Sequence, residues 1–149
     1  MTTVSSPLAG RVLPLEDVPD PVFADALVGP GGAVDPVRVP LEALAPLDGI
    51  VVSLLAHTFT VVDTAGRAVL THLGIDTVQL AGEGFEPLVG KGDRVRRGQP
   101  LVRWDPAAVA ASGRSPVCPV IALEASAADL TGLRTGRDVR AGDVLFSWN

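Results

Sequence analysis

Glycine and proline interrupt the chain so often that only short regular elements fit between them, and this feature constrains the fold most. The 149 residues include 16 glycines and 13 prolines, spread along the chain rather than clustered. Glycine is destabilising inside a helix and proline breaks one, so long helices are disfavoured. The stretches between them are apolar or alternate between apolar and polar positions, which is typical of strands bounded by turns.

Seven segments have this strand pattern, and three others have weaker helical signals. The predicted strands are residues 41–45, 50–55, 59–63, 68–71, 77–80, 101–104 and 144–148. Short helical segments are expected at residues 19–26, 106–112 and 126–130, the second with Asp105 as its N-cap. The sequence therefore predicts an all-β fold, an antiparallel β-sandwich or barrel-like domain with minor short helices. Residues 1–149 are predicted to form a single domain, with a short flexible N-terminus at residues 1–5.

Two segments of the chain resemble each other. Residues 92–104 and 136–148 share a G-x-x-V-x-x-G-x-x-L pattern that ends, three residues later, in tryptophan. Residues 7–10 and 46–49 form a weaker pair. Two copies are too few for a solenoid, which needs at least three stacked units. We therefore interpret the copies as strand–turn–strand elements in two halves of one β-structure.

Composition excludes several functional classes. The net charge is −5 and the pI about 4.8, which argues against nucleic-acid binding but allows a basic protein partner. Cys118 is the only cysteine, so a disulfide framework is excluded, and its apolar neighbours predict a buried, inert thiol. No segment is long and apolar enough for a membrane span, and no signal pattern precedes Pro7. These features predict a cytoplasmic protein without direct membrane insertion.

The two histidines, His57 and His72, flank a predicted β-hairpin. Its strands are residues 58–62 and 67–71, and its turn centre lies near Thr64 and Ala65, midway between the histidines. Antiparallel pairing would place the histidines directly opposite each other, with Cβ atoms roughly 5 Å apart.

Two imidazoles at that distance suit two kinds of chemistry. In phosphoryl transfer, a neutral imidazole nitrogen attacks phosphorus while the second imidazole donates a hydrogen bond to the developing negative charge. In metal binding, two histidines would need a third ligand, for which Asp76 is the only local candidate. On spacing alone, structural roles for both histidines remain an equal alternative.

Gly74 and Asp76 follow His72 closely. Gly74 would allow the backbone to pack against the imidazole, so that a carbonyl accepting from Nδ1–H fixes the tautomer and leaves Nε2 as the nucleophile. Asp76 has two interpretations of equal weight: it supports the histidine site, or it caps the turn before Thr77.

Residues 72–80 read H-L-G-I-D-T-V-Q-L, and residues 82–85 read G-E-G-F. Residues 16–20 read E-D-V-P-D, and residues 46–49 read P-L-D-G. Together these segments resemble the glucose-family IIA component of the phosphoenolpyruvate-dependent sugar phosphotransferase system. The first segment resembles its phosphohistidine signature, and the likeness extends from about residue 5 to residue 148.

This resemblance implies a β-sandwich protein that acts as a phosphotransferase component. His72 would accept a phosphoryl group on Nε2 from the phosphohistidine of the carrier protein HPr. It would then pass the group to a cysteine of a IIB domain of a sugar permease. His57 would stabilise the phosphoryl group without being phosphorylated, and Gly74 and Asp76 would support the site. A purely regulatory IIA-like binding module is the alternative, and regulated permeases or kinases are implied as further partners.

The resemblance also implies an apolar rim around the two histidines. We assign Phe23, Leu54 and Leu70 to this rim, with core packing as the alternative for Phe23. An apolar rim would exclude water and protect a labile phosphoramidate. No cofactor is required for the carrier activity, and zinc would bind His57 and His72 only where a partner adds a carboxylate.

The chain departs from the family pattern near His57. Leu55 stands where many members have a threonine that orients this histidine, and residues 49–57 are about two residues shorter than expected. Thr58 or a backbone carbonyl is therefore the candidate for orienting His57.

Two other functional classes fit the sequence less well. The repeated G-x-x-V-x-x-G pattern also occurs in biotinyl and lipoyl carrier domains, but Lys91, the only lysine, lacks their flanking residues. A metallohydrolase on a related β-fold would need a further histidine-rich motif, which this chain does not have.

Overall fold

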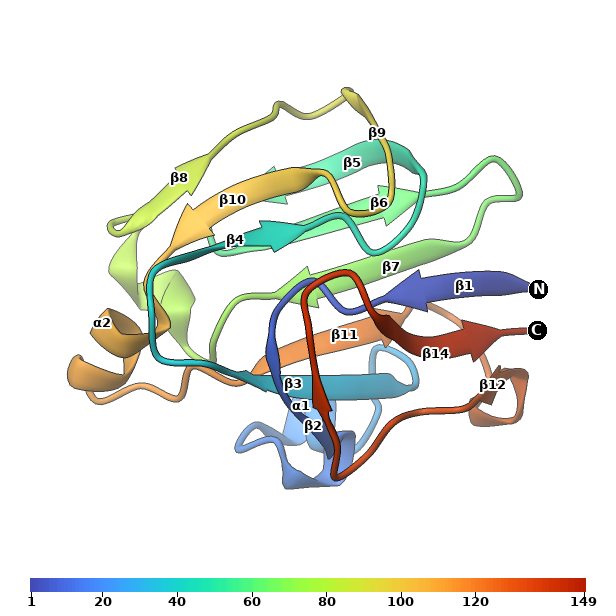
Figure 1. Cartoon of the computed structure of the whole chain (residues 1–149), viewed down its shortest axis with the longest axis horizontal. Coiled ribbons are helices and arrows are strands. Elements are labelled where there is room, and N and C mark those ends of the chain that lie inside the picture. The colour runs from blue at the N-terminus through green and yellow to red at the C-terminus, as the bar shows by residue number, and fades with distance from the viewer.

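Strands are the main regular elements of the computed structural model, which describes all residues from 1 to 149 (Figure 1). The strands are β1 (Thr2–Ser5), β2 (Gly10–Pro14), β3 (Gly31–Pro36), β4 (Leu41–Leu44), β5 (Gly49–Leu55), β6 (Thr58–Val62), β7 (Ala68–His72), β8 (Phe85–Pro87), β9 (Arg94–Val95), β10 (Pro100–Trp104), β11 (Cys118–Ala122), β12 (Leu130–Thr131), β13 (Asp138–Val139) and β14 (Val144–Trp148). The helices are η1 (Leu15–Asp17), α1 (Pro21–Ala24), η2 (Thr77–Leu80), α2 (Pro106–Ala111) and η3 (Ala127–Asp129). None of these helices has the length and apolar character that crossing a bilayer would require.

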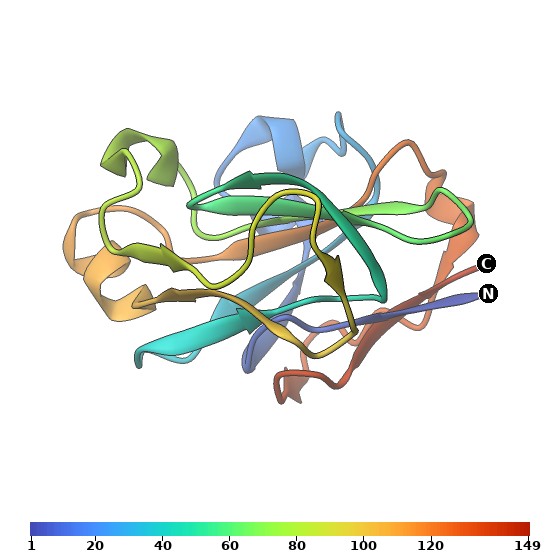
Figure 2. The ribbon, with the colours of Figure 1, turned by 90° about the horizontal axis from the view of Figure 1, so that it is seen from above.

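The strands pair antiparallel and form three sheets. The largest has the order β13-β2-β3-β11-β7-β6-β5-β9, and the smaller ones are β4-β10-β8 and β1-β14-β12. Seen from above in Figure 2, β4 and β10 lie on one side of β5, β6 and β7, whereas α1 and η2 lie on the other. The predicted all-β antiparallel sandwich with short helices is therefore confirmed.

Part of the large sheet is covered on both faces. Successive side chains of a strand point to opposite sides, so its strands contribute to two hydrophobic clusters. Phe59 and Val69 have no exposed surface and belong to the main core, together with Leu101 of β10. A smaller cluster, which contains Phe23 and Ile121, covers the other face near α1. The side of the sheet that carries α1 and η2 is the one that holds the histidine site.

Residues 77–80 form the helix η2 instead of the predicted strand, whereas the other six predicted strands are present. Gly74 (φ +83°) and Asp76 (φ +59°) turn the chain before η2. The Thr77 hydroxyl then donates to the Leu73 carbonyl oxygen at 2.9 Å, which holds the turn closed. The prediction was wrong because four residues of mixed polarity fit one helical turn as well as a strand.

The N-terminus also differs from the flexible segment expected at residues 1–5. Thr2–Ser5 form β1, which pairs with β14, and Val4 has no exposed surface. Its partner strand lies at the other end of the sequence, so no local pattern indicates that these four residues pair. The structure therefore corrects this expectation.

The helical predictions are confirmed as short elements within the expected ranges. In α2 the Asp105 carboxylate accepts from Ala107 N–H at 3.0 Å, so Asp105 is the predicted N-cap. In α1 the Asp20 carboxylate accepts from Val22 N–H at 2.9 Å, in the same arrangement. This second cap places Asp20 at the edge of the site described next.

Candidate active site at two histidines

His57 and His72 come together at one end of the β6–β7 hairpin. In the antiparallel register Thr58 lies opposite His72, and the His57 carbonyl oxygen accepts from Leu73 N–H at 2.7 Å. The prediction that the histidines lie directly opposite each other is therefore wrong by one residue. His57 lies in the turn between β5 and β6, so the alternation of a strand does not force its side chain to the other face. The ring centroids are 5.0 Å apart, which confirms the predicted close approach of the two imidazoles.

A backbone carbonyl determines which nitrogen of His72 carries the proton. Nδ1 of His72 lies 2.5 Å from the carbonyl oxygen of Gly74, so Nδ1–H donates to that oxygen. In the neutral ring the free lone pair is then on Nε2. The close backbone contact predicted from Gly74 is thus present, and Nε2 is the ring nitrogen available for a nucleophilic attack.

Only glycine fits at position 74. Its φ of +83° lies in the left-handed region, which side chains with a Cβ rarely adopt. A Cβ there would lie 2.7 Å from Cγ2 of Thr77 and 3.2 Å from the carbonyl oxygen of Ser115. Gly74 therefore allows both the turn and the close packing that bring its carbonyl oxygen to His72.

Two carboxylates act on the charge of His72. Burial lowers the pKa of His72 below its ordinary value, while the Gly74 carbonyl, Asp20 and Asp76 each raise it by a smaller amount. Asp76 is exposed, has a left-handed backbone and makes no side-chain cap to η2, so the capping interpretation is wrong. Its effect on the site is electrostatic. Asp20 was not predicted as a site residue, although an aspartate before Pro21 is a recognisable N-cap signal.

His57 is held differently from His72. It is 7% exposed, and neither of its ring nitrogens has a hydrogen-bond partner within the chain. Burial and, to a smaller extent, the charge on His72 lower the pKa of His57. Thr58, one of the two candidates for orienting this ring, instead donates its hydroxyl to the Thr71 carbonyl oxygen at 3.0 Å. Packing and the edge-to-face contact with His72, whose ring plane is inclined at 76°, therefore position His57.

The structure places two of the three predicted rim residues on the face of the sheet that carries His72. The Phe23 ring lies 5.2 Å from that of His72, centroid to centroid, and is only 7% exposed, so it also belongs to the smaller core cluster. Leu70 lies two residues before His72 and packs against the same cluster. Leu54 pairs with Phe59 and packs against the main core, so its assignment to the rim is wrong. The rim position on β5 is that of Leu55, which is 57% exposed.

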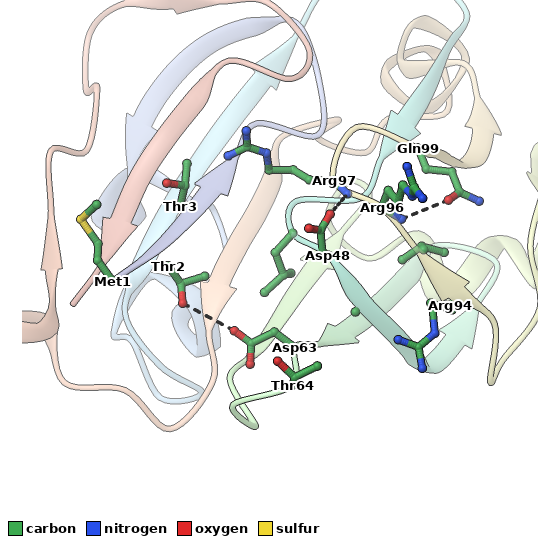
Figure 3. Close-up of a pocket in the computed structure, with 13 residues that line it drawn as sticks. Met1, Thr2, Thr3, Asp48, Asp63, Thr64, Arg94, Arg96, Arg97 and Gln99 are labelled. Carbon is green, nitrogen blue, oxygen red and sulfur yellow. Dashed lines mark hydrogen bonds between the residues drawn. The ribbon is translucent and has the colours of Figure 1, made fainter.

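The surroundings of the histidines form an apolar surface rather than an enclosed pocket. Val22, Leu55 and Val78 are large exposed apolar residues on α1, β5 and η2, the elements next to the histidines. An open cavity of about 910 Å³ lies elsewhere on the protein, as Figure 3 shows. Asp48 and Arg96 are among the residues that line it, and neither histidine does. The histidine site is therefore suited to contact with another protein more than to enclosing a small molecule.

Two nitrogen ligands are all that the chain itself offers to a metal at this site. His57 and His72 form the pair, and no group of three or more histidine, cysteine, aspartate or glutamate side chains is placed to hold a metal ion. A tetrahedral zinc ion would need further ligands from outside the chain. Cys118 is fully buried and its Sγ contacts the Pro116 carbonyl oxygen, and burial raises the pKa of its thiol. It is the inert thiol that the sequence predicts.

Comparison with protein families gives a match over most of the chain. Residues 2–128 match the family described as phosphoenolpyruvate-dependent sugar phosphotransferase system, EIIA 1. The chain is similar to the glucose-specific EIIA component of Oceanobacillus iheyensis, with 40% identity over 121 residues, which are 80% of this chain and 72% of that protein. It is also similar to the glucose-specific EIIA component of Bacillus cereus, with 35% identity over 129 residues, 85% of this chain and 77% of that one.

Two further similarities concern a longer protein and a solved structure. The glucose-specific EIIBCA component of Corynebacterium glutamicum is 36% identical over 126 residues, which are 85% of this chain but only 19% of that protein. The solved structure of glucose permease IIA from Mycoplasma capricolum superimposes with a TM-score of 0.88 at 32% identity, covering 97% of this chain and 93% of that one.

Proposed function

The chain belongs to the EIIA 1 family of the phosphoenolpyruvate-dependent sugar phosphotransferase system, and we propose that it carries a phosphoryl group on Nε2 of His72. The observation that carries this proposal is the hydrogen bond from Nδ1–H of His72 to the Gly74 carbonyl oxygen. It leaves the Nε2 lone pair free, and burial keeps the pKa of the ring low enough for that lone pair to be unprotonated at neutral pH.

The transfer exchanges one nitrogen–phosphorus bond for another. Nε2 of His72 attacks the phosphorus on the phosphohistidine of HPr, the bond to the HPr nitrogen breaks, and its electron pair returns to HPr. The His72 ring keeps its Nδ1 proton and becomes positively charged. The Gly74 carbonyl oxygen, Asp20 and Asp76 stabilise that charge, since each of them favours the cationic form of the ring. A cysteine thiolate of a IIB domain then attacks the same phosphorus, and His72 becomes neutral again.

His57 is the partner of His72 in this step. The centroid of its ring lies 5.0 Å from that of His72. At this separation, an oxygen of a phosphoryl group whose phosphorus is bound to Nε2 can accept a hydrogen bond from His57. Because neither of its ring nitrogens is bonded within the chain, its N–H is free to donate. Burial lowers the pKa of His57, which favours the neutral ring before a phosphoryl group arrives.

Protein partners fit the surface around His72. The exposed apolar residues Val22, Leu55 and Val78 provide a contact area, and Asp20 and Asp76 favour a partner with basic residues facing them. A IIB domain as acceptor is supported by the Corynebacterium glutamicum relative, which is a single EIIBCA chain. We propose HPr as the donor and the cytoplasm as the location, where these partners meet.

No cofactor takes part in the proposed transfer. Zinc would bind His57 and His72 only at an interface where the partner supplies a carboxylate. A purely regulatory role, in which the protein binds permeases or kinases without carrying phosphate, is the outcome if the following experiment fails.

The experiment measures phosphate uptake by intact mass. The protein is incubated with phosphoenolpyruvate, the general phosphotransferase enzyme and HPr, and it should gain one phosphoryl group that is acid-labile and alkali-stable. His72→Ala should abolish uptake. His57→Ala should still accept the group but donate it slowly to the IIB cysteine. Absence of uptake by the wild-type protein would contradict the carrier function, and uptake by His72→Ala but not by His57→Ala would reverse the two roles.

A further inference from the structure

Arg114 lies beside the loop that carries His72. It follows α2, and the carbonyl oxygen of its neighbour Ser115 accepts from Ile75 N–H at 2.8 Å. Ile75 in turn follows Gly74, whose carbonyl oxygen holds the His72 ring. Figures 1 and 2 both place α2 and η2 at the same end of the molecule. The segment of Arg114 is thus packed directly against the loop that positions the reactive histidine.

An open cavity of about 470 Å³ lies beside the contact between these two segments. From the His72 loop and η2 it is lined by Asp76 and Gln79, and from the segment after α2 by Ser112 and Arg114. Its lining is mostly polar, with a carboxylate and a guanidinium among its groups. Asp76 is close enough to the His72 ring to raise its pKa, so this cavity lies near the reactive histidine, although His72 does not line it.

The guanidinium of Arg114 is held in place but has no acidic partner. Its Nε and Nη2 donate to Oε1 of Gln79 at 3.3 and 3.1 Å, and its Nη1 donates to Oγ of Ser112 at 3.1 Å. Every ion pair in the protein involves other arginines, so no carboxylate lies within 4.0 Å of this cation. Nη2 has only one acceptor, so its second N–H is free. The result is a half-buried cation whose orientation is fixed before any ligand arrives.

We expect a protein that docks on His72 with an interface of ordinary size to cover this cation as well. A standard interface hides about 800 Å² of surface on each partner, which corresponds to a disc of about 16 Å radius. Asp76, which lines the cavity, is only four residues along the chain from His72. A guanidinium covered by a partner loses water, and this is unfavourable unless the partner supplies an oxyanion. A carboxylate matches the planar N–H groups of arginine best.

We propose that Arg114 is a specificity residue that binds a carboxylate on the protein that docks over His72, an inference that rests on the proposed carrier function. Asp20 and Asp76 favour basic groups on the same partner, whereas Arg114 favours an acidic one. A partner surface is attracted when its basic groups face the two aspartates and its carboxylate faces Arg114. A surface with these charges exchanged is repelled. The arrangement therefore selects both the partner and its orientation on the site.

The test measures transfer rates against partner concentration, with phospho-HPr as donor and with a IIB domain as acceptor. Arg114→Ala should raise KM for at least one of these partners about three- to tenfold, because one charge-assisted contact is lost. Its kcat should stay within about twofold, because Arg114 touches no reacting atom. The increase should diminish at high salt, and Arg114→Lys should restore only part of the loss, since lysine cannot present two parallel donors.

Controls separate this role from folding and from free anions. Arg134→Ala removes an equal charge at an exposed arginine without a side-chain partner, and its KM should match the wild type. Unchanged KM for both partners in Arg114→Ala would overturn the inference. Saturable binding of inorganic phosphate to the wild-type protein, seen in the NMR signal of Arg114 Nε–H, would overturn it in favour of a free-anion site. Wild-type protein that accepts no phosphoryl group would instead refute the carrier function itself.

Discussion

Replacing Gly74 with alanine should separate two physical reasons for glycine in the His72 loop. The first is backbone strain, because φ at Gly74 is +83°, and holding alanine in the left-handed region costs about 1–2 kcal/mol. The second is overpacking, because the added Cβ would lie 2.7 Å from Cγ2 of Thr77 and 3.2 Å from the Ser115 carbonyl oxygen. Forcing a methyl group into such a site costs a further amount of about 1–3 kcal/mol. The expected loss in the free energy of unfolding is therefore about 2–5 kcal/mol.

Gly66→Ala is the matched control for this substitution. Gly66 lies at the tip of the β6–β7 hairpin with a φ of +85°, and no atom lies within 4 Å of where its Cβ would be. It shares the strain of Gly74 but not its close packing, so Gly66→Ala should cost only about 1–2 kcal/mol. Urea unfolding of both variants, followed by circular dichroism at one temperature, gives the two free energies.

Phosphate uptake should also differ between the two variants, because only Gly74→Ala disturbs the loop that holds His72. In Gly74→Ala the loop must shift to relieve the contact with Thr77, and the carbonyl oxygen that accepts from His72 Nδ1 moves with it. Phosphate uptake should therefore slow markedly in folded Gly74→Ala and remain normal in Gly66→Ala. Equal stability of the two variants, or normal uptake by Gly74→Ala, would refute the argument that the close approach at this position holds the histidine.

Two further predictions concern titration and the rim. Because burial lowers the pKa of His57 and His72, NMR titration should place both below about 6.5, and Asp76→Asn should lower that of His72 further. The folded protein binds fewer protons than the unfolded chain in that range, so its stability should fall as the pH decreases from about 6.5, as urea unfolding at several pH values can test. Leu54→Ala should cost about 2 kcal/mol in unfolding free energy, whereas Leu55→Ala should stay within about 0.5 kcal/mol and weaken partner binding instead. The reverse pattern would return Leu54 to the rim.

Local patterns predicted six of the fourteen strands as strand segments, but they did not predict how the strands pair into sheets. β5, β6 and β10 have apolar runs between clear turn signals, and the structure confirms them. β11 was not predicted, because all five of its residues are buried and no alternation marks it as a strand. η2 was predicted as a strand because its four residues are too few to distinguish a period of two from one of 3.6.

The histidine site shows the same division at the scale of single residues. The hairpin pattern brought His57 and His72 together, because a tight turn connects neighbouring strands whatever their tertiary surroundings. Their direct opposition was wrong because His57 lies in a turn, where the alternation of strand side chains no longer applies. The assignment of Leu54 to the rim came from the family resemblance in a segment about two residues shorter than expected. There, a misplacement by one residue moves a side chain to the opposite face of the strand.

The sequence alone determined the kinds of residue that the site contains and the close approach of its two histidines, since both depend on interactions within about fifteen residues. Only the tertiary structure showed that Asp20 acts on the His72 ring and that Arg114 borders the His72 loop without an acidic partner. These residues are 52 and 42 positions from His72 in the chain, and no local periodicity or turn pattern encodes contacts at such separations. They arise because the packing of α1 and α2 against the sheet brings those segments to the same loop.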